Sequence, residues 1–201
     1  MDTDLLQRTL KEITQKDERF QYGDLIATRS NSLVSRAIRW FMSKQNPTKD
    51  TFSHIAVVIN LWDQTWIAEA LAQGVVVHSL KQSGYDTHKQ LILLRFKKGF
   101  SEQQIKDICL SMVQHAGIRY QFSNLLLWAA KIGIKLDLLR KNNEKRIYCS
   151  ELGAIAINTA YPGTFPTPNK TSPADHYTRR DLYEIIDINN ILQEKSILKS
   201  K

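Results

Sequence analysis

The chain opens with apolar positions at a helical period. Leucine and isoleucine side chains recur on one face of residues 4–16, which predicts an amphipathic N-terminal helix. A turn at Gly23-Asp24 leads into a short buried strand at Leu25–Thr28. A second helix with one apolar face is predicted from residue 31 or 32 to about residue 41, and the breaker-rich segment 45–50 follows it.

The next part of the chain has the composition of β-strands. β-Branched and apolar residues dominate four segments, 52–60, 65–71, 74–80 and 90–96. The connections between the first three segments are short enough for hairpins. This part of the chain therefore predicts an antiparallel meander, in which each strand pairs with the next one.

Helical periods return in the second half of the chain. Ser101 is placed to cap a helix that reaches about His115. A further apolar stretch covers residues 125–139, and a run of small and apolar residues predicts a helix over 149–160. A short helix that begins at Ser172-Pro173 and a last strand at 182–188 complete the pattern.

These elements predict one α+β domain at residues 21–190, preceded by the N-terminal helix (1–20) and followed by a basic tail (191–201). A hydrophobic content of 42% with 24% charged residues is typical of a soluble globular protein. No apolar run reaches membrane-spanning length and no secretory signal is visible. We therefore expect a cytoplasmic protein, with delivery by other machinery left open.

The net charge of +8 raises the question of a nucleic-acid or anionic-surface partner. The basic residues are spread along the chain, however, and the sequence has no helix-turn-helix, RNP-like, zinc-finger or glycine-rich phosphate motif. We therefore expect no nucleic-acid partner. The two cysteines have no C-x-x-C spacing, so neither a disulfide framework nor a metal site nor a cofactor is expected.

The two cysteines have different surroundings. Cys109 lies in an apolar helical pattern that is typical of a core position. Cys149 is followed by Ser150 and Glu151, which suit a first helical turn because serine caps helices and an acid complements the dipole. With the basic residues 145–146 just upstream, Cys149 is expected to be a partly exposed nucleophile with a low pKa. Plain packing in a core is the alternative interpretation.

A nucleophilic thiol needs a base, and that base needs an orienting group. His54 lies near the start of the strand at 52–60. A four-residue turn at 60–63 would place it directly opposite Glu69, the one acid in an otherwise apolar strand. The alternative is that Glu69 lies on a solvent-facing surface. Structural roles, either satisfied or solvated, are predicted for the other histidines: His78, His88, His115 and His176.

In their order along the chain, these motifs resemble a known family. They are Gly23-Asp24-Leu25-Ile26, Ser53-His54-Ile55-Ala56, Glu69-Ala70 with Gly74-Val75, and Tyr148-Cys149-Ser150-Glu151-Leu152. The set covers roughly residues 22–188 and is similar to the circularly permuted NlpC/P60 (permuted papain-fold) thiol hydrolases, above all to their YiiX/YebB-like group. The resemblance implies a papain-like α+β fold: a central antiparallel meander or barrel packed against helices, with the cysteine at a helix N-terminus.

The resemblance also implies a role for each matching residue. Cys149 is the expected nucleophile, His54 the general base, and Glu69 the group that orients the base. Gly117-Ile118-Arg119-Tyr120 resembles a tyrosine-containing segment that precedes the cysteine helix in the family. Tyr120, together with Tyr148 beside the thiol, is therefore expected to contact the substrate.

Two further segments bear on the resemblance. Gln121 stands where the family usually has an acid after the tyrosine, which is a departure from its pattern. Ser172-Pro173-Ala174-Asp175 resembles the Ser/Thr-Pro-x-Asp segment near the end of the family's domain. We interpret Asp175 first as a helix cap, because a serine, a proline and an acid in this order are typical of a helix start.

The implied reaction is hydrolysis of an amide bond through a thioester acyl-enzyme, without a metal or another cofactor. Peptide, isopeptide, peptidoglycan-fragment and acyl-ester substrates all fit a thiol cleft. The nearest alternative is a lipid acyltransferase or thioesterase of the lecithin:retinol acyltransferase-like type, which carries an Asn-Cys-Glu-His-type motif where this chain has Tyr148-Cys149-Ser150-Glu151. A non-catalytic binding module with a basic surface is the alternative from a different class.

Overall fold

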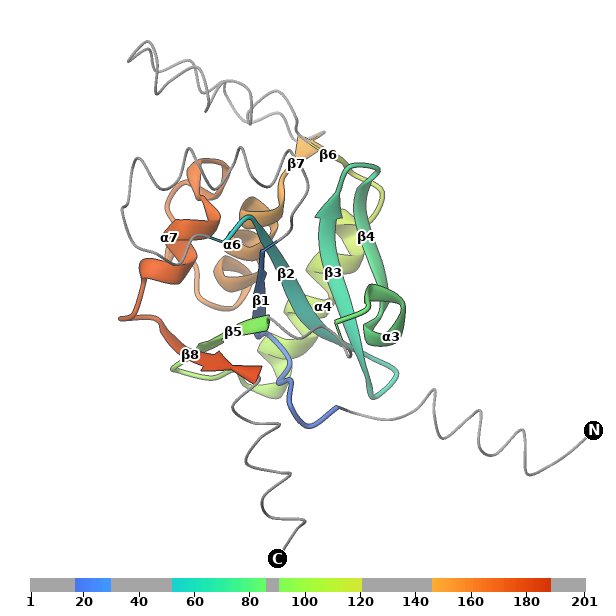
Figure 1. Cartoon of the computed structure of the whole chain (residues 1–201), viewed down its shortest axis with the longest axis horizontal. Helices are drawn as coiled ribbons and strands as arrows, with labels where there is room; N and C mark the ends of the chain where they lie inside the picture. Colours follow the sequence, from blue (N-terminus) through green and yellow to red (C-terminus); the bar gives the residue numbers. More distant parts are fainter. Residues whose placement is uncertain (1–16, 30–51, 86–90, 121–145, 189–201) are drawn as a thin grey trace, which may run out of the picture.

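The computed structural model describes residues 17–29, 52–85, 91–120 and 146–188, and the account below concerns these ranges. Six strands form one antiparallel sheet (Figure 1): β1 (Leu25–Thr28), β2 (His54–Leu61), β3 (Gln64–Leu71), β4 (Gly74–Ser79), β5 (Leu91–Phe96) and β8 (Tyr183–Asp187). Their order in the sheet is β4-β3-β2-β1-β5-β8. With helices packed on this sheet, the protein has the mixed α+β architecture that the sequence predicts.

The sheet departs from the predicted meander at one place. β2, β3 and β4 pair in succession as predicted, but β5 pairs with β1, which therefore lies between β2 and β5. Short loops identify the hairpins, whereas the partner of a strand after a longer connection leaves no local signal. The predicted strand 74–80 also ends one residue early, because Ser79 forms a capping box with Gln82 and starts α3 (Leu80–Ser83).

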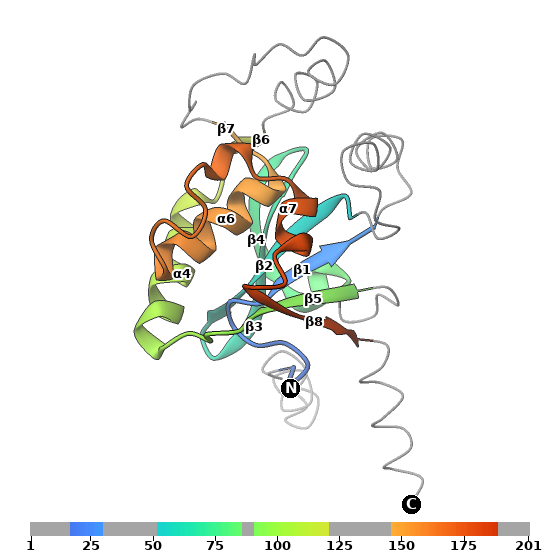
Figure 2. The same cartoon turned by 90° about the vertical axis from the view of Figure 1, so that its left-hand side faces the viewer.

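Two helices cover one face of the sheet (Figure 2). α4 (Glu102–His115) begins at a capping box between Ser101 and Gln104, and α6 (Cys149–Ala160) packs against both α4 and β2. Both helices were predicted with these bounds. The core between them and the sheet contains fully buried apolar side chains, among them Leu25, Ile55, Val57, Leu94, Ile108, Met112 and Leu152.

Cys109 on α4 is only partly buried, which corrects its predicted place in the core. Its thiol donates to the backbone oxygen of Asn60 across 2.8 Å, and the side chain packs against the margin of the core. The fully buried side chains of this helix are Ile108 and Met112. Burial raises the pKa of the Cys109 thiol, which makes it a poor nucleophile at neutral pH.

Short elements complete the described structure. β6 (Arg119–Tyr120) pairs in parallel with β7 (Arg146–Ile147), a pairing that the sequence did not predict. The loop after α6 contains a 3-10 turn, η1 (Pro168–Lys170). α7 (Pro173–Thr178) begins at a capping box between Ser172 and Asp175, so the interpretation of Asp175 as a helix cap is confirmed. Among the helices described, none has the length and apolarity that crossing a membrane requires.

Several predicted features fall outside the described residues. They are the helices at 4–16 and 31–41, the loop at 45–50, the apolar stretch 125–139 and the basic tail 191–201. His88, Gln121 and Lys145 also fall outside them. For all of these, the sequence-based expectations stay predictions.

Candidate active site

The N-terminus of α6 places Cys149 beside β2. Tyr148 is the extended residue before the helix, with φ −113° and ψ 167°, and Cys149 is the first helical residue. Ser150 does not cap the helix as predicted, because its hydroxyl donates to the backbone oxygen of Thr171 across 2.8 Å. Glu151 instead accepts the backbone N–H of Tyr148, which is one half of a capping box. The N–H of Cys149 has no acceptor within the helix, since the first N–H groups of any helix lack one.

The Cys149 side chain is buried, and only 4% of the residue is exposed, so the predicted partial exposure is wrong. Burial raises the pKa of the thiol. Its effect is outweighed by the hydrogen bond and charge of His54, with smaller contributions from hydrogen bonds to the backbone N–H groups of Ile55 and Ser150. The pKa of Cys149 is therefore lowered. We expected the basic residues upstream of Cys149 to contribute to the low pKa of its thiol. Arg146 is exposed, however, and the His54 imidazole is the main cause of the lowered pKa.

The structure brings together the histidine and the carboxylate that the sequence paired. His54 is the first residue of β2, and its Nε2 lies 2.6 Å from Oε2 of Glu69 on β3. The register of the predicted pairing is wrong, because Ala56 rather than His54 lies directly opposite Glu69. His54 is instead a diagonal neighbour of Glu69 on the same face of the sheet, a position from which long side chains still reach each other.

The turn between β2 and β3 explains the register error. Trp62 and Asp63 both have positive φ, 52° and 57°, and Leu61 pairs with Gln64. A two-residue turn with two left-handed residues therefore replaces the predicted four-residue turn. Tryptophan has no preference for this conformation, so the sequence carries no signal for it. A shift of two positions keeps the face of a strand, which is why the two side chains still meet.

Glu69 has two further partners. Its Oε1 lies 2.7 Å from Nε2 of His78 on β4, and the hydroxyl of Tyr85 donates to Oε2 across 2.9 Å. Burial raises the pKa of this carboxyl, but the hydrogen bonds from His54 and His78 outweigh it and lower the pKa to about 2. Sequence analysis missed the contacts of Tyr85 and His78. The available signal was that His78 shares its strand face with Val76, which pairs with Glu69.

His54 lies between the carboxylate and the thiol. Its Nε2 faces Glu69, which leaves Nδ1 as the ring nitrogen for the hydrogen bond with Cys149. Burial lowers the pKa of His54, but the hydrogen bonds and charges of Cys149 and Glu69 outweigh burial and raise the pKa to about 10. These environments favour an imidazolium–thiolate pair over a neutral imidazole beside a neutral thiol.

Two tyrosines lie in the neighbourhood of the thiol. Tyr120 on β6 forms a hydrogen bond with Cys149. Burial, together with the charge of Cys149, raises the pKa of the Tyr120 phenol. Gly74 allows β6 to lie close to the β3–β4 turn: its φ is 126°, and a Cβ there would lie 2.8 Å from a backbone oxygen of the segment before β6. The Tyr148 hydroxyl donates to a backbone oxygen of η1 across 3.4 Å. Of the two tyrosines, Tyr120 is thus the one whose hydroxyl contacts the thiol.

His176 of α7 lies behind the site and is fully buried. Its Nε2 donates to the backbone oxygen of Ser150 across 2.9 Å, and its Nδ1 lies 3.2 Å from the hydroxyl of Tyr183. Burial lowers the pKa of His176 to about 4, so this imidazole is neutral at pH 7. A Cβ on Gly153 would lie 2.9 Å from Cγ2 of Ile55 and 3.4 Å from the His176 ring. These contacts agree with the structural role predicted for His176.

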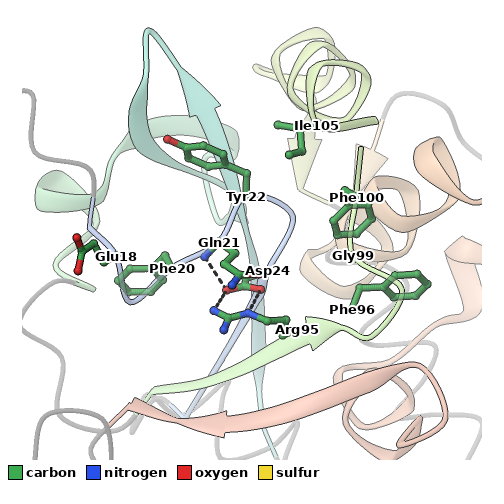
Figure 3. A pocket seen from close by; sticks show the side chains of 10 residues that line it. All are labelled: Glu18, Phe20, Gln21, Tyr22, Asp24, Arg95, Phe96, Gly99, Phe100 and Ile105. Carbon is green, nitrogen blue, oxygen red and sulfur yellow. Dashed lines mark hydrogen bonds and ion pairs between the residues drawn. The ribbon is translucent and has the colours of Figure 1, made fainter. Parts of the chain in front are cut away.

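A separate recess lies at the other end of β1 (Figure 3). It is a cavity of about 360 Å³ lined by Glu18, Phe20, Gln21, Tyr22, Asp24, Arg95, Phe96, Gly99, Phe100 and Ile105. Asp24 accepts hydrogen bonds from Nε and Nη2 of Arg95, at 3.1 and 2.8 Å. Asp24 directly precedes β1, whereas Thr28, the last residue of β1, pairs with His54. The recess is therefore distinct from the surroundings of the thiol.

One solved structure with a similar fold is the crystal structure of the metalloprotein yiiX from Escherichia coli O157:H7, DUF1105. The match has a TM-score of 0.51 and 24% sequence identity, and it covers 70% of this chain. It spans 66% of the yiiX chain, just under two thirds of its length. The sequence matches no protein-family model and no curated protein. The chain therefore shares a fold with the yiiX structure, which is consistent with the YiiX-like group that its motifs resemble.

Proposed function

We propose that this protein is a cysteine hydrolase of the permuted papain type, which cleaves an amide bond with Cys149, His54 and Glu69. The observation that carries the proposal is the order of the contacts. A thiol at a helix N-terminus is hydrogen-bonded to an imidazole, and a carboxylate lies 2.6 Å from the other nitrogen of that imidazole. A nucleophile, a base and an orienting group in this order are what thiol hydrolysis needs. The order of the motifs along the chain supports the proposal.

In the first half of the reaction, the Cys149 thiolate attacks the substrate carbonyl carbon and a carbon–sulfur bond forms. The resulting oxyanion is stabilised by the backbone N–H of Cys149 and by the hydroxyl of Tyr120. The His54 imidazolium gives its proton to the leaving nitrogen, the carbon–nitrogen bond breaks, and an amine departs. Glu69 holds the Nε2–H of His54 and stabilises the positive charge of the ring. A thioester remains on Cys149.

In the second half, neutral His54 takes a proton from a water molecule, whose oxygen attacks the thioester carbon. Collapse of this intermediate breaks the carbon–sulfur bond and releases the product acid. The thiolate and the imidazolium are restored, and one water is consumed for each bond that is cleaved. An acyl ester would follow the same steps with an alcohol in place of the amine as the leaving group.

The word metalloprotein in the description of yiiX raises the question of a metal in this chain. The described residues do not fit a metal centre. They contain no group of three or more His, Cys, Asp or Glu side chains that could hold an ion. Both oxygens of Glu69 are already taken by imidazole and hydroxyl partners. The proposed steps use only side chains and backbone groups of the chain itself.

Alkylation by iodoacetamide across pH tests the proposal within one sample. Cys149 is buried and Cys109 is partly exposed, so accessibility alone predicts that Cys109 reacts first. The pKa values predict the opposite order, because the pKa of Cys149 is lowered and that of Cys109 is raised. We expect Cys149 to be alkylated first, and at a pH well below the ordinary thiol pKa of about 8.5. Peptide mass spectrometry of both sites gives the two rates, and faster alkylation of Cys109 would contradict the proposal.

Turnover of defined substrates tests the reaction itself. Cys149→Ala and His54→Ala are expected to abolish cleavage, and Glu69→Gln to leave weaker activity, with unchanged far-UV circular dichroism. Cys109→Ala is the matched control and keeps full activity. A panel of peptide, peptidoglycan-fragment and acyl-ester substrates separates the candidate reactions. Activity on the acyl ester alone would replace the amidase assignment with that of an acyltransferase or thioesterase.

A further inference from the structure

Glu69 is shared by two imidazoles. Nε2 of His54 lies 2.6 Å from its Oε2, and Nε2 of His78 lies 2.7 Å from its Oε1. The two histidines belong to β2 and β4, the strands on either side of β3. Ala56 and Val76 are the residues directly opposite Glu69, and each histidine is two positions away from one of them. The carboxylate is therefore held diagonally from both neighbouring strands.

Hydrogen-bond chemistry fixes what each partner presents to this carboxylate. An ionised carboxylate only accepts hydrogen bonds, so His54 and His78 must each present an Nε2–H. The hydroxyl of Tyr85 donates to Oε2, the oxygen that His54 also contacts. Among the described residues, the donor to Oε1 is His78. The terminal torsion of a glutamate is otherwise broad, so a donor at each oxygen is what fixes the plane of the group.

We infer that His78 is a positioning residue: by holding Oε1 of Glu69 it fixes the carboxylate that orients His54, and it thereby sets the pH range in which Cys149 is nucleophilic. The inference rests on the proposed function and adds a fourth member to its set of residues. His78 acts through Glu69 and takes no part in the bond-making steps.

The titratable groups around this carboxylate come from every element packed near it. His54 on β2, His78 on β4 and Tyr85 after α3 contact the carboxylate itself, and His54 and Tyr120 on β6 contact Cys149 on α6. Burial raises the pKa of both Tyr85 and Tyr120, so these phenols stay neutral over the range in which thiols react. The pH response of the thiol is therefore set by the charges of His54 and of Cys149 itself.

Loss of His78 leaves Oε1 without its donor. The carboxylate can then rotate about its terminal torsion. The Nε2–H of His54 therefore loses an acceptor in a fixed position. The imidazolium is stabilised less, and so is the thiolate that it pairs with. Cys149 should therefore become nucleophilic only at a higher pH.

Two amide variants form a matched pair for the test. The side-chain nitrogen of glutamine reaches about as far as Nε2 of histidine, whereas that of asparagine ends near the position of Nδ1. His78→Gln therefore keeps a donor for Oε1 of Glu69, and His78→Asn loses it. We expect the midpoint of the pH–rate profile for Cys149 alkylation to move up by about one pH unit in His78→Asn, as for a thiol that loses part of its cationic support. The His78→Gln profile should stay close to that of the wild type.

The experiment uses the full chain, with Cys109 as the internal reference for each variant. A His78→Asn profile that coincides with the wild type would overturn the role of His78 alone. Equal shifts in the two variants would overturn it as well, because the reach of the donor would then not matter. An ordinary thiol profile for Cys149 in the wild-type protein would overturn the proposed function and, with it, the role of His78.

Discussion

At the scale of single residues, the number of hydrogen-bond donors decides the charge of a buried carboxyl. Glu69 and Glu151 are both buried, with 4% and 8% of each residue exposed. Glu69 has three side-chain partners and its pKa is lowered to about 2, although burial acts against this. Burial raises the pKa of Glu151 to about 7, because one backbone N–H does not compensate for the loss of water. Two glutamates with similar exposure therefore carry different charges at pH 7.

The depressed pKa of Glu69 predicts a specific acid sensitivity. The pKa is about 2 in the folded chain against 4.5 for the unperturbed group, so ionised Glu69 stabilises the fold fully above about pH 4.5. This stabilisation is lost as the pH falls towards 2. Glu69→Gln removes it at every pH, so the difference in urea midpoint between the wild type and Glu69→Gln should shrink between pH 6 and pH 3. A difference that stays constant over this range would contradict the ionised state of Glu69.

Sequence reasoning found part of this residue set and missed part of it, for a physical reason. His54 and Glu69 were recognisable because the alternation of side chains along two strands places them on one face of the sheet. An error of two positions in the register leaves both side chains on that face. His78 lies on the same face of the next strand, but alternation does not show whether a side chain contacts a carboxylate or water. The contact depends on side-chain conformation, which the sequence pattern does not contain.

At the scale of elements, the packing of α6 on β2 depends on a glycine. Gly153 faces Ile55 and His176, and a Cβ at this position would lie 2.9 Å from the Ile55 side chain. Glycine inside a helix normally costs stability relative to alanine, by about 0.5–1 kcal/mol. Its use here lets the helix lie close enough to the strand for Cys149 to contact His54, which immediately precedes Ile55.

Gly153→Ala is therefore expected to destabilise the protein, by about 1–3 kcal/mol as in other overpacked cores, even though alanine is the better helix former. It should also weaken the contact between Cys149 and His54, seen as slower alkylation of Cys149 at a pH below the ordinary thiol pKa of about 8.5. The control is the double variant Gly153→Ala, Ile55→Ala. Removal of the Ile55 side chain gives the new methyl group room, so the added cost of Gly153→Ala should largely disappear in that background.

The predictability of the elements depended on whether their ends carry local signals. Ser101 was recognised as a helix start because serine is a preferred cap, and Ser172 because a proline and an acid follow it in the first helical turn. In the structure, both serines form capping boxes. The parallel pair β6–β7 carries no such signal, because its two strands are short and far apart in sequence. The turn at Trp62-Asp63 was missed because its two left-handed residues are not the glycine or asparagine that usually mark such turns.

At the scale of the whole molecule, the two ends of β1 have different roles. Thr28 at one end pairs with His54 and so adjoins the site. At the other end, Asp24 and Arg95 form an ion pair whose carboxylate is almost fully buried, with 2% of the aspartate side chain exposed against 22% for the arginine. The backbone N–H of Gln21 also donates to this carboxylate, at 2.8 Å. The ion pair therefore links the segment before β1 to β5.

Arg95→Leu is expected to destabilise the fold by about 3–5 kcal/mol, because it leaves the buried Asp24 carboxylate without its cation. Chemical denaturation at pH 7 measures the effect. Arg179→Leu is the matched control, since Arg179 pairs with the exposed Asp181 and its loss should hardly change the midpoint. Adding Asp24→Asn to Arg95→Leu should restore part of the stability by removing the uncompensated charge. Equal effects of Arg95→Leu and Arg179→Leu would contradict a stabilising role for the buried pair.

The parallel pairing of β6 with β7 has a consequence for the connection between the two strands. It holds Tyr120 next to Ile147, so the described ranges that end at Tyr120 and begin at Arg146 meet at one place, beside Tyr120 and its contact with Cys149. A parallel pair needs a connection of a dozen or more residues, and this one exceeds that minimum. A change in the length of this connection therefore leaves in place the pairing that holds Tyr120 beside the candidate site.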